Sequence, residues 1–402
     1  MTQTQTRMGQ TEFIAMIAML FATIAFSIDS MLPALPVIAA ELSPDAPNTA
    51  QLIITSFVLG MGLGTFVAGP LSDSFGRRRI IVLGAILYCI AAAAAYFAPT
   101  LETLLMARVV QGLGAAAPRV VSLALVRDLY KGRDMARIVS FAMMIFTLVP
   151  AVAPLAASGV ISAFGWRSIF AAFLLFAAIS SAWLLLRQPE TLPAESRRPF
   201  RAAPLFAALR EVLSHRTIVT TMAVQTLIFG ALFGTLSSTQ QIFDTTFDRG
   251  PSFPLWFALV ALCAGVASPV NAMLVGRLGM RVMITRTLIA QIILSSTMVA
   301  LTLAGALQGD TAFAAFVLWM IGVFAMAGLT LGNLNALALE PVGHIAGMAA
   351  SVTGAISTVL AVAVAAPLGL AFNGTYIPIT LGVAVMAMLA LALMLSIPNA
   401  KT

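Results

Sequence analysis

The stretch GPLSDSFGRRR, residues 69–79, joins two long apolar runs of the chain. Gly69 allows two helices to approach closely, and Gly76 allows a tight turn. Asp73 stands at the end of the first run, where its carboxylate could cap a neighbouring helix or pair with a nearby arginine. A cluster of arginines follows directly and favours the cytoplasmic side of a membrane: Arg77, Arg78 and Arg79. The stretch therefore predicts a cytoplasmic turn between two membrane-spanning helices.

The composition places the chain in a lipid bilayer. Of its 402 residues, 60% are hydrophobic and only 9% are charged, whereas soluble domains carry about 25% charged residues. The net charge of +7 does not indicate nucleic acid as a partner, because the basic residues do not gather on a soluble domain. Cys89 and Cys263 lie in apolar runs, and His215 and His344 are far apart in the sequence. We therefore expect no disulfide scaffold, no metal site and no cofactor.

Twelve apolar runs are long enough to cross a bilayer, which takes about 20 residues. They lie at residues 13–36, 50–71, 80–98, 103–126, 138–163, 167–187, 217–243, 254–276, 282–305, 312–339, 344–371 and 375–397. If the N-terminus is cytoplasmic, 18 of the 22 Lys and Arg residues fall on the inner side, and only Arg167 and Arg249 fall outside. This asymmetry predicts an all-α membrane protein with twelve transmembrane helices and with both termini in the cytoplasm.

A basic polar segment divides the chain into two halves. Because residues 188–216 form the longest polar segment, we predict one six-helix bundle over 1–187 and a second over 217–402. The loops at Gly76 and Gly279 occupy the same place in the two halves, and both are basic. This correspondence suggests a structural repeat.

The polar segment itself allows two interpretations. Phe206, Leu209 and Leu213 recur at helical spacing among charged residues, which is typical of an amphipathic helix on a membrane surface. The alternative is a solvated linker between the bundles. The sequence leaves both interpretations open.

Three stretches resemble signature motifs of the major facilitator superfamily. Residues 69–79 match its loop-two motif throughout, and RVVQGLGAAAPR (108–119) keeps the Arg, Gln and two Gly residues of its span-four motif. LVPAVAPLAASG (148–159) resembles its span-five antiporter motif without the leading glycines. The resemblance implies two bundles that rock around a cavity lined by spans one, four, seven and ten. It also implies a set of residues for conformational gating: Gly69, Asp73, Gly76, Arg77, Arg78, Pro150 and Pro154.

Three further stretches resemble a narrower group, the bicyclomycin and chloramphenicol (Bcr/CflA) drug-resistance transporters. They are DSMLPALPVIAAEL (29–42), VRDLYKG (126–132) and FGWRSIF (164–170). This resemblance implies a monomer in a bacterial inner membrane that exchanges a small-molecule substrate for protons.

Asp29 is the only acid between Phe13 and Glu41, and an ionisable group inside an apolar run is a functional candidate. It lies roughly 24 Å along the first run, and Arg108 lies roughly 8 Å from the outer end of the fourth, so the two have a similar depth. We interpret them as a proton-coupling pair, because bundle movement would change both the desolvation of the carboxylate and its distance from the cation. The alternatives are a structural ion pair, or an Asp29 side chain that reaches the outer interface near Glu41.

The other polar groups in the predicted spans are candidates for a substrate cavity. Arg119 lies about 16 Å deeper than Arg108 and could bind an anionic or carbonyl-bearing substrate, or pair with an acid or with backbone carbonyls. Four amides could bind a neutral substrate or link helices: Gln111, Gln225, Asn333 and Asn335. Glu340 ends the tenth run, where we expect an inner-gate contact or a second protonation site.

These features predict a secondary transporter that exports small hydrophobic drugs or antibiotics with proton coupling. The second hypothesis is a carrier of one metabolite, with Arg108 and Arg119 binding an anion. An enzyme is disfavoured because the sequence holds no phosphate-binding loop, no Gly-x-Ser-x-Gly and no His/carboxylate cluster. A receptor would be expected to carry a sizeable soluble domain. Since no ATP-binding segment is present, the expected energy source is an ion gradient, of H⁺ or of Na⁺.

Overall fold

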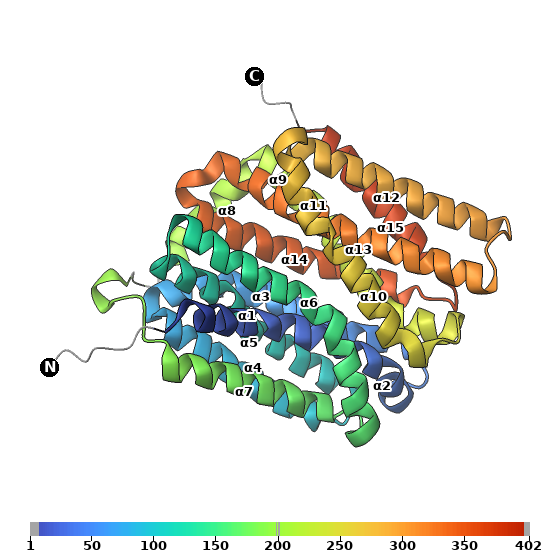
Figure 1. The fold of residues 1–402 in the computed structure, drawn as a ribbon, viewed down its shortest axis with the longest axis horizontal. Helices are drawn as coiled ribbons and strands as arrows, with labels where there is room; N and C mark the ends of the chain where they lie inside the picture. The colour runs from blue at the N-terminus through green and yellow to red at the C-terminus, as the bar shows by residue number, and fades with distance from the viewer. Residues whose placement is uncertain (1–7, 198, 200–201, 398–402) are drawn as a thin grey trace.

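The computed structural model describes residues 8–197, 199 and 202–397, and every regular element within these ranges is helical. The helices lie side by side in two groups, with α1–α7 in one and α9–α15 in the other (Figure 1). The first group comprises α1 (Gln10–Asp29), η1 (Leu32–Ala34), α2 (Leu35–Leu42), η2 (Pro47–Gln51), α3 (Leu52–Phe75), α4 (Arg77–Tyr96), α5 (Leu101–Leu129), α6 (Gly132–Phe164) and α7 (Ser168–Arg187). A connecting segment follows, with η3 (Ala194–Ser196) and α8 (Ala202–Ser214). The second group comprises α9 (Arg216–Gln241), η4 (Ile242–Thr246), η5 (Gly250–Ser252), α10 (Phe253–Gly265), α11 (Ala267–Leu278), α12 (Met280–Leu303), α13 (Gly309–Leu339), η6 (Glu340–Ile345), α14 (Ala346–Leu370) and α15 (Ile377–Leu395).

Among the described residues, eleven helical segments are long and apolar enough to cross a membrane. The longest, Gly309–Leu370, has 62 residues and consists of α13, the turn η6 and α14. Each of the twelve apolar runs in the sequence overlaps at least one of the helices. The prediction of an all-α membrane protein is therefore confirmed.

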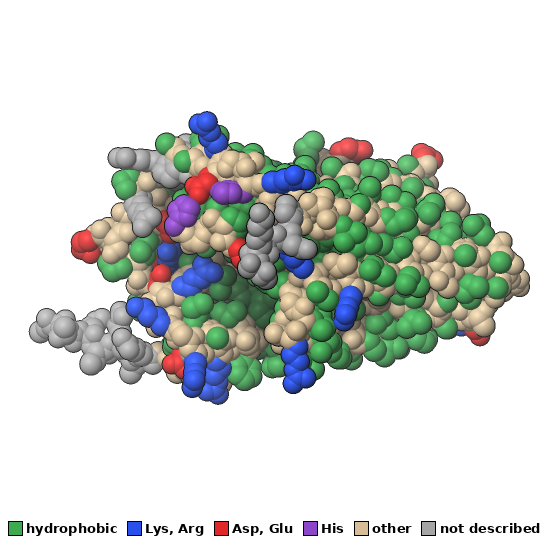
Figure 2. Space-filling view, turned by 90° about the horizontal axis from the view of Figure 1, so that it is seen from above, with side chains coloured by type: hydrophobic (Ala, Val, Ile, Leu, Met, Phe, Trp, Pro, Cys, Tyr) green, Lys and Arg blue, Asp and Glu red, His purple; other side chains and the backbone are tan. Residues whose placement is uncertain are grey.

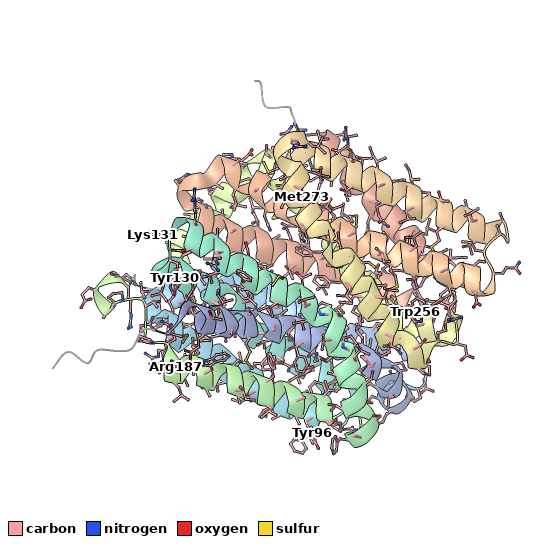
Figure 3. The ribbon with its side chains drawn as sticks, in the orientation of Figure 1. Tyr96, Tyr130, Lys131, Arg187, Trp256 and Met273 are labelled. Atoms are coloured by element: carbon pink, nitrogen blue, oxygen red, sulfur yellow. The ribbon has the colours of Figure 1, made fainter. Side chains whose placement is uncertain are left out.

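Basic residues meet at one end of the molecule, which we call the basic end: Arg77 pairs with Asp128 at the end of α5, beside Arg127 and Lys131, and Arg78 binds the carbonyl of Leu185 near the end of α7. Figure 2 shows the concentration of Lys and Arg over this end and a mainly hydrophobic surface elsewhere on the same face. Tyr130 and Lys131, in the α5–α6 turn, lie at the basic end, and Trp256 of α10 lies at the opposite end (Figure 3). The start of α1 is also at the basic end, because Arg187 binds both carboxylate oxygens of Glu12 at 2.7 and 2.8 Å.

The turns at Gly76 and Gly279 have the same backbone conformation. Gly76 has φ 100° and ψ 149°, and Gly279 has φ 85° and ψ 152°. Glycine adopts positive φ without the steric cost that a Cβ adds. Each glycine ends one helix and begins the next, α3–α4 in the first group and α11–α12 in the second. The two loops therefore correspond in conformation as well as in sequence.

Helices α3 and α5 touch backbone to backbone. A Cβ added at Gly60 would lie 1.8 Å from the Val109 carbonyl oxygen, and one at Gly112 would lie 2.0 Å from that of Phe57. Small residues permit this approach, which favours van der Waals packing inside a membrane. The glycines of the stretch 108–119 therefore serve helix packing. They also fix the position of the other side chains on α5.

The connecting segment contains a helix that docks on the second group. Val212 of α8 is fully buried against a cluster that includes Ala349 and Val352 of α14. Phe206 and Leu213 remain 65% and 48% exposed. Of the two interpretations of this segment, the structure contains the amphipathic helix, with part of its apolar face packed on protein.

Candidate functional site

A cavity of about 380 Å³ lies between the two groups of helices. Its wall is formed by α1, α3, α5 and α6 of the first group and by α9, α13 and α14 of the second. It extends to the basic end, since Arg127, Leu339 and Gly347 lie where α5 and α13 end and α14 begins. Figure 2 shows a hollow with hydrophobic side chains at this end. A larger hollow of about 670 Å³ is lined only by residues of 8–189, so it does not lie between the groups.

Arg119 projects from α5 into the cavity, where its side chain is exposed. Its one polar contact among the described residues runs from Nη1 to the Sδ atom of Met61, at 3.9 Å. Sulfur is a weak acceptor. Because no carboxylate pairs with Arg119 in the described part of the chain, the guanidinium group is available to a ligand or to water.

Two of the predicted amides line the opposite wall. Gln225 of α9 donates from Nε2 to Oδ1 of Asn335 on α13, at 2.9 Å, and its Oε1 accepts from Ser357 of α14 at 3.2 Å. Gln225 is buried, whereas Asn335 is exposed to the cavity. The network links three helices and leaves the Asn335 amide N–H groups as donors toward the cavity.

Arg108 lies outside the cavity lining and is fully buried. Its guanidinium group donates to the Ser27 carbonyl at 2.9 Å, the Ile53 carbonyl at 3.3 Å and Oε1 of Gln111 at 2.7 Å. It also stacks over the ring of Phe57 at 4.4 Å. Arg108 thus joins α5 to α1 and α3, and its partner Gln111 is not a cavity residue.

Asp29 is the last residue of α1 and is buried. Its carboxylate has no hydrogen-bond or ion-pair partner among the described residues. The structure does not bring it into contact with Arg108, which binds instead to the carbonyl of Ser27 two residues earlier on the same helix. An isolated carboxylate is far less costly to bury when it is protonated.

The remaining amide and acid of the sequence prediction lie away from the cavity. Asn333 is buried and exchanges hydrogen bonds with Asn271 of α11, at 2.8 and 3.4 Å. Its role in the structure is to link two helices of one group. Glu340 begins η6, is exposed and has no partner among the residues that the structure describes.

The stretch 69–79 builds a charged cluster at the basic end. Arg77 donates to Asp73 at 2.5 Å and to Asp128, at the end of α5, at 3.1 Å. Arg78 donates to the carbonyl of Leu185 on α7. Of the two expectations for Asp73, the structure contains the pairing with an arginine.

Glu190, which the sequence prediction missed, occupies the N-terminus of α4. Its carboxylate accepts the backbone N–H groups of Arg77 at 2.9 Å and Arg78 at 3.2 Å. A negative charge is favourable here, because the first N–H groups of a helix lack intrahelical partners and carry positive partial charge. The neighbouring Thr191 also donates to Asp128, at 2.9 Å. The connecting segment is thereby bound to the stretch 69–79.

Other predicted gating residues lie on helices that face the second group. Gly69 faces α14, where a Cβ would lie 3.6 Å from Oγ of Ser351. Pro150 and Pro154 lie within α6, which continues as one helix past both prolines. Helix α6 packs on α10 of the second group as well as on α1.

A cluster of uncharged polar side chains joins the two groups at the end opposite the basic end. Gln51 of η2 donates to Gln241 of α9 at 2.5 Å and accepts from Ser238 of α9 at 2.9 Å. Gln241 donates to Asn48 at 2.7 Å, and Asn48 donates to the carbonyls of Phe372 at 2.8 Å and Leu370 at 3.1 Å. We call Asn48, Gln51, Ser238 and Gln241 the amide cluster. The cavity is therefore bounded by polar contacts between the groups on the side away from the basic end.

Comparison with known proteins decides the family. Residues 15–367 match the family model described as Major Facilitator Superfamily. The chain belongs to this superfamily. Membership makes it a membrane transporter rather than an enzyme.

Individual relatives agree with the superfamily assignment. An uncharacterised MFS-type transporter of Bacillus subtilis, YdgK, is 28% identical over 345 residues, which cover 83% of this chain and 82% of the relative. A bicyclomycin resistance protein homolog of Haemophilus influenzae is 28% identical over 350 residues, covering 86% and 85%. A crystal structure of a D-xylose-proton symporter superposes with a TM-score of 0.77 at 16% identity, over 96% of this chain and 98% of that one. The resemblance to drug-resistance members of the superfamily is confirmed.

Two of the three stretches that resemble the drug-resistance group contact each other in this superfamily member. Glu41, in the stretch 29–42, accepts from Trp166 and from Arg167, both at 2.6 Å, and these lie in the stretch 164–170. Asp128, in the stretch 126–132, binds the arginine cluster described above. The stretches therefore hold helix ends together at both ends of the first group.

Proposed function

We propose that this superfamily member is a secondary transporter that exports small hydrophobic compounds by alternating access. One observation carries the proposal: the cavity opens toward the basic end, while the amide cluster joins the two groups at the other end. This arrangement fits an inward-facing state if the basic end is cytoplasmic, as the positive-inside rule favours. The drug-resistance name of the Haemophilus influenzae relative supports export of toxic compounds.

The proposal includes a topology. The segment Gly309–Leu370 would be about 93 Å long as one straight helix, so it crosses a bilayer of about 30 Å twice. Twelve crossings then result, with both termini in the cytoplasm. Two bundles, 1–187 and 217–402, move against each other, and the segment 188–216 connects them. The transporter acts as a monomer in a bacterial inner membrane.

Asp29 is the proposed proton-coupling residue. It is buried without a cation in this inward-facing form, so protonation there is favoured by the cost of burying charge. Arg108 holds the end of α1 through Ser27, so a shift of α1 against α5 alters the surroundings of Asp29. A gating role is proposed for two sets of residues. The stretch 69–79 and Glu340 lie at helix ends, and Pro150 and Pro154 lie in α6, which packs on the second group.

The proposal is tested by drug susceptibility in an efflux-deficient host, with and without a protonophore. Resistance that the protonophore removes is the expected result. Asp29→Asn should abolish it at unchanged membrane expression, because an amide is not ionisable and cannot take up and release a proton as a carboxyl group does. Wild-type resistance in that variant would exclude Asp29 as the coupling residue.

A second candidate function is favoured by the arginines of the cavity. Arg119 and Arg127 suit a carrier of one anionic metabolite. In that case the protein would give the host no resistance to any of the drugs tested. The host would instead take up one metabolite in a proton-dependent manner.

A further inference from the structure

The cavity between the two groups carries positive charge and no acid. Its lining in the described part of the chain includes Arg119 and Arg127 and contains no Asp or Glu. Both arginines belong to α5 and lie about 12 Å apart along the helix axis. A cation that enters from the basic end meets two like charges between low-dielectric walls, where charge interactions are strong. An anion meets two opposite charges.

Arg119 differs from Arg108 and Arg77 because no oxygen atom of the described residues accepts a hydrogen bond from it. Arg108 is satisfied by two carbonyls and one amide oxygen, and Arg77 is satisfied by carboxylates. Arg119 contacts only a sulfur atom within the described residues. A guanidinium group inside a membrane needs a partner or water, so the vacant donors of Arg119 define the polar end of a ligand site.

The facing wall supplies further donors rather than a competing charge. The Oδ1 atom of Asn335 is engaged by Gln225, which leaves its N–H groups to donate. The hydroxyl of Ser351 donates to its own helix, at the Gly347 carbonyl. The cavity therefore offers hydrogen-bond donors from both groups of helices to the acceptor atoms of a ligand: Arg119 from the first group and Asn335 from the second.

The rest of the lining is apolar and partly aromatic. Phe21, Phe146 and Phe229 come from three different helices, and Met143 adds an adaptable surface. A volume of about 380 Å³ lies in the range of sites for drug-sized molecules. The site thus combines an apolar body with one polar pole of hydrogen-bond donors.

We propose that this cavity takes amphipathic organic anions and discriminates against lipophilic cations of the same size. The carboxylate or comparable acceptor group binds Arg119 and Asn335, and the apolar body lies against the phenylalanines. The inference rests on the proposed function, because it names the substrate class of the same cavity.

Two probes that share the same naphthalene ring system and carry opposite charges test the inference directly. Binding of radiolabelled 2-naphthoate and 2-naphthylmethylammonium to the full chain in phosphatidylcholine nanodiscs is measured by equilibrium dialysis, with empty nanodiscs subtracted. The wild-type protein should bind the anion about 10- to 100-fold more tightly, as expected for hydrogen bonds to a charged group. Arg119→Gln should remove this preference, and Arg119→Lys should keep part of it.

Arg137→Gln is the matched control, because it removes the same charge from an exposed position on α6 outside the cavity. It should leave the ratio of the two affinities unchanged. Equal affinities in the wild-type protein, or an unchanged ratio in Arg119→Gln, would overturn the inference. If Arg119→Gln does not fold, the wild-type ratio and the Arg119→Lys variant still decide.

The binding test separates this inference from the proposed function. Protonophore-sensitive resistance together with equal binding of both probes would refute the substrate class and leave export standing. A strong preference for the anion without export of any compound would refute export and leave the substrate class standing.

Discussion

Removing one side chain from the amide cluster should open the side of the transporter that lies away from the basic end. Gln51→Ala deletes two hydrogen bonds between the groups, to Gln241 at 2.5 Å and from Ser238 at 2.9 Å. Each buried hydrogen bond contributes about 0.5–1.5 kcal/mol net, so the closed state loses about 1–3 kcal/mol relative to the open one. That free energy raises the ratio of open to closed molecules about 5- to 150-fold.

The open fraction is measured by pulsed electron spin resonance between two labels. Suitable sites are Asp45 and Ala306, exposed positions in loops of the first and second groups, each changed to Cys in a chain that lacks Cys89 and Cys263. The variant should gain a population with a longer label-to-label distance.

Gln291→Ala is the control for this prediction. Gln291 is also a buried glutamine, but its hydrogen bond goes to Ser295 of the same helix, at 3.0 Å. It should lower stability without a change in the distance distribution. If Gln51→Ala and Gln291→Ala give the same distribution as the parent chain, the amide cluster does not hold the closed state.

Three further substitutions test other contacts. Gly369→Ala would place a Cβ 2.4 Å from Oε1 of Gln51, so it should displace that side chain and lengthen the same spin-label distance. Gly112→Ala would place a Cβ 2.0 Å from the Phe57 carbonyl, and overpacking of this kind costs about 1–3 kcal/mol; the apparent unfolding temperature in detergent should fall, and an unchanged value would contradict the tight α3–α5 contact. Glu190→Gln should cost about 0.3–1 kcal/mol by removing a charge from a helix N-terminus, and the loss in unfolding temperature should shrink at high salt, because salt screens exposed charges.

The course of the helices could be predicted from the sequence because a membrane helix needs a long apolar run. The repeat was also visible, since Gly76 and Gly279 are the residue type that a positive φ favours. The connecting segment was harder: Phe206, Leu209 and Leu213 indicated a helix, but its docking on α14 depends on Val212 and on residues over a hundred positions away.

In the candidate site, residue type and depth along the helix did not predict which partner each polar side chain binds. Depth along the helices placed Arg108 near Asp29, yet Arg108 binds backbone carbonyls, and every residue supplies that acceptor. The amides could be assigned either to the cavity or to helix contacts, and the structure divides them: Gln225 and Asn335 line the cavity, whereas Gln111 and Asn333 do not. Which way a side chain faces depends on neighbouring helices.

The missed contacts are all distant in sequence. Glu190 binds Arg77, which lies 113 positions earlier in the sequence, and Gln51 binds Gln241, which lies 190 positions later. Neither residue lies in one of the quoted motifs: Glu190 is in the polar segment 188–216, and Gln51 is the second residue of the run 50–71. Their partners become apparent only when the helix ends are placed together.

The uncharged side chains of the amide cluster determine how the contact between the two groups responds to salt. The two arginines at that end are each paired with an acid inside one group, Arg167 with Glu41 and Arg249 with Asp310, both at 2.6 Å, whereas the described polar contacts of the cluster between the groups are uncharged. Dissolved salt weakens exposed ion pairs by screening their charges, but it has little effect on hydrogen bonds between uncharged amides. We therefore expect the contacts of the amide cluster between the two groups to keep the same strength when the salt concentration of the surrounding water changes. The ion pairs that the medium does affect lie within each half, away from the joint between them.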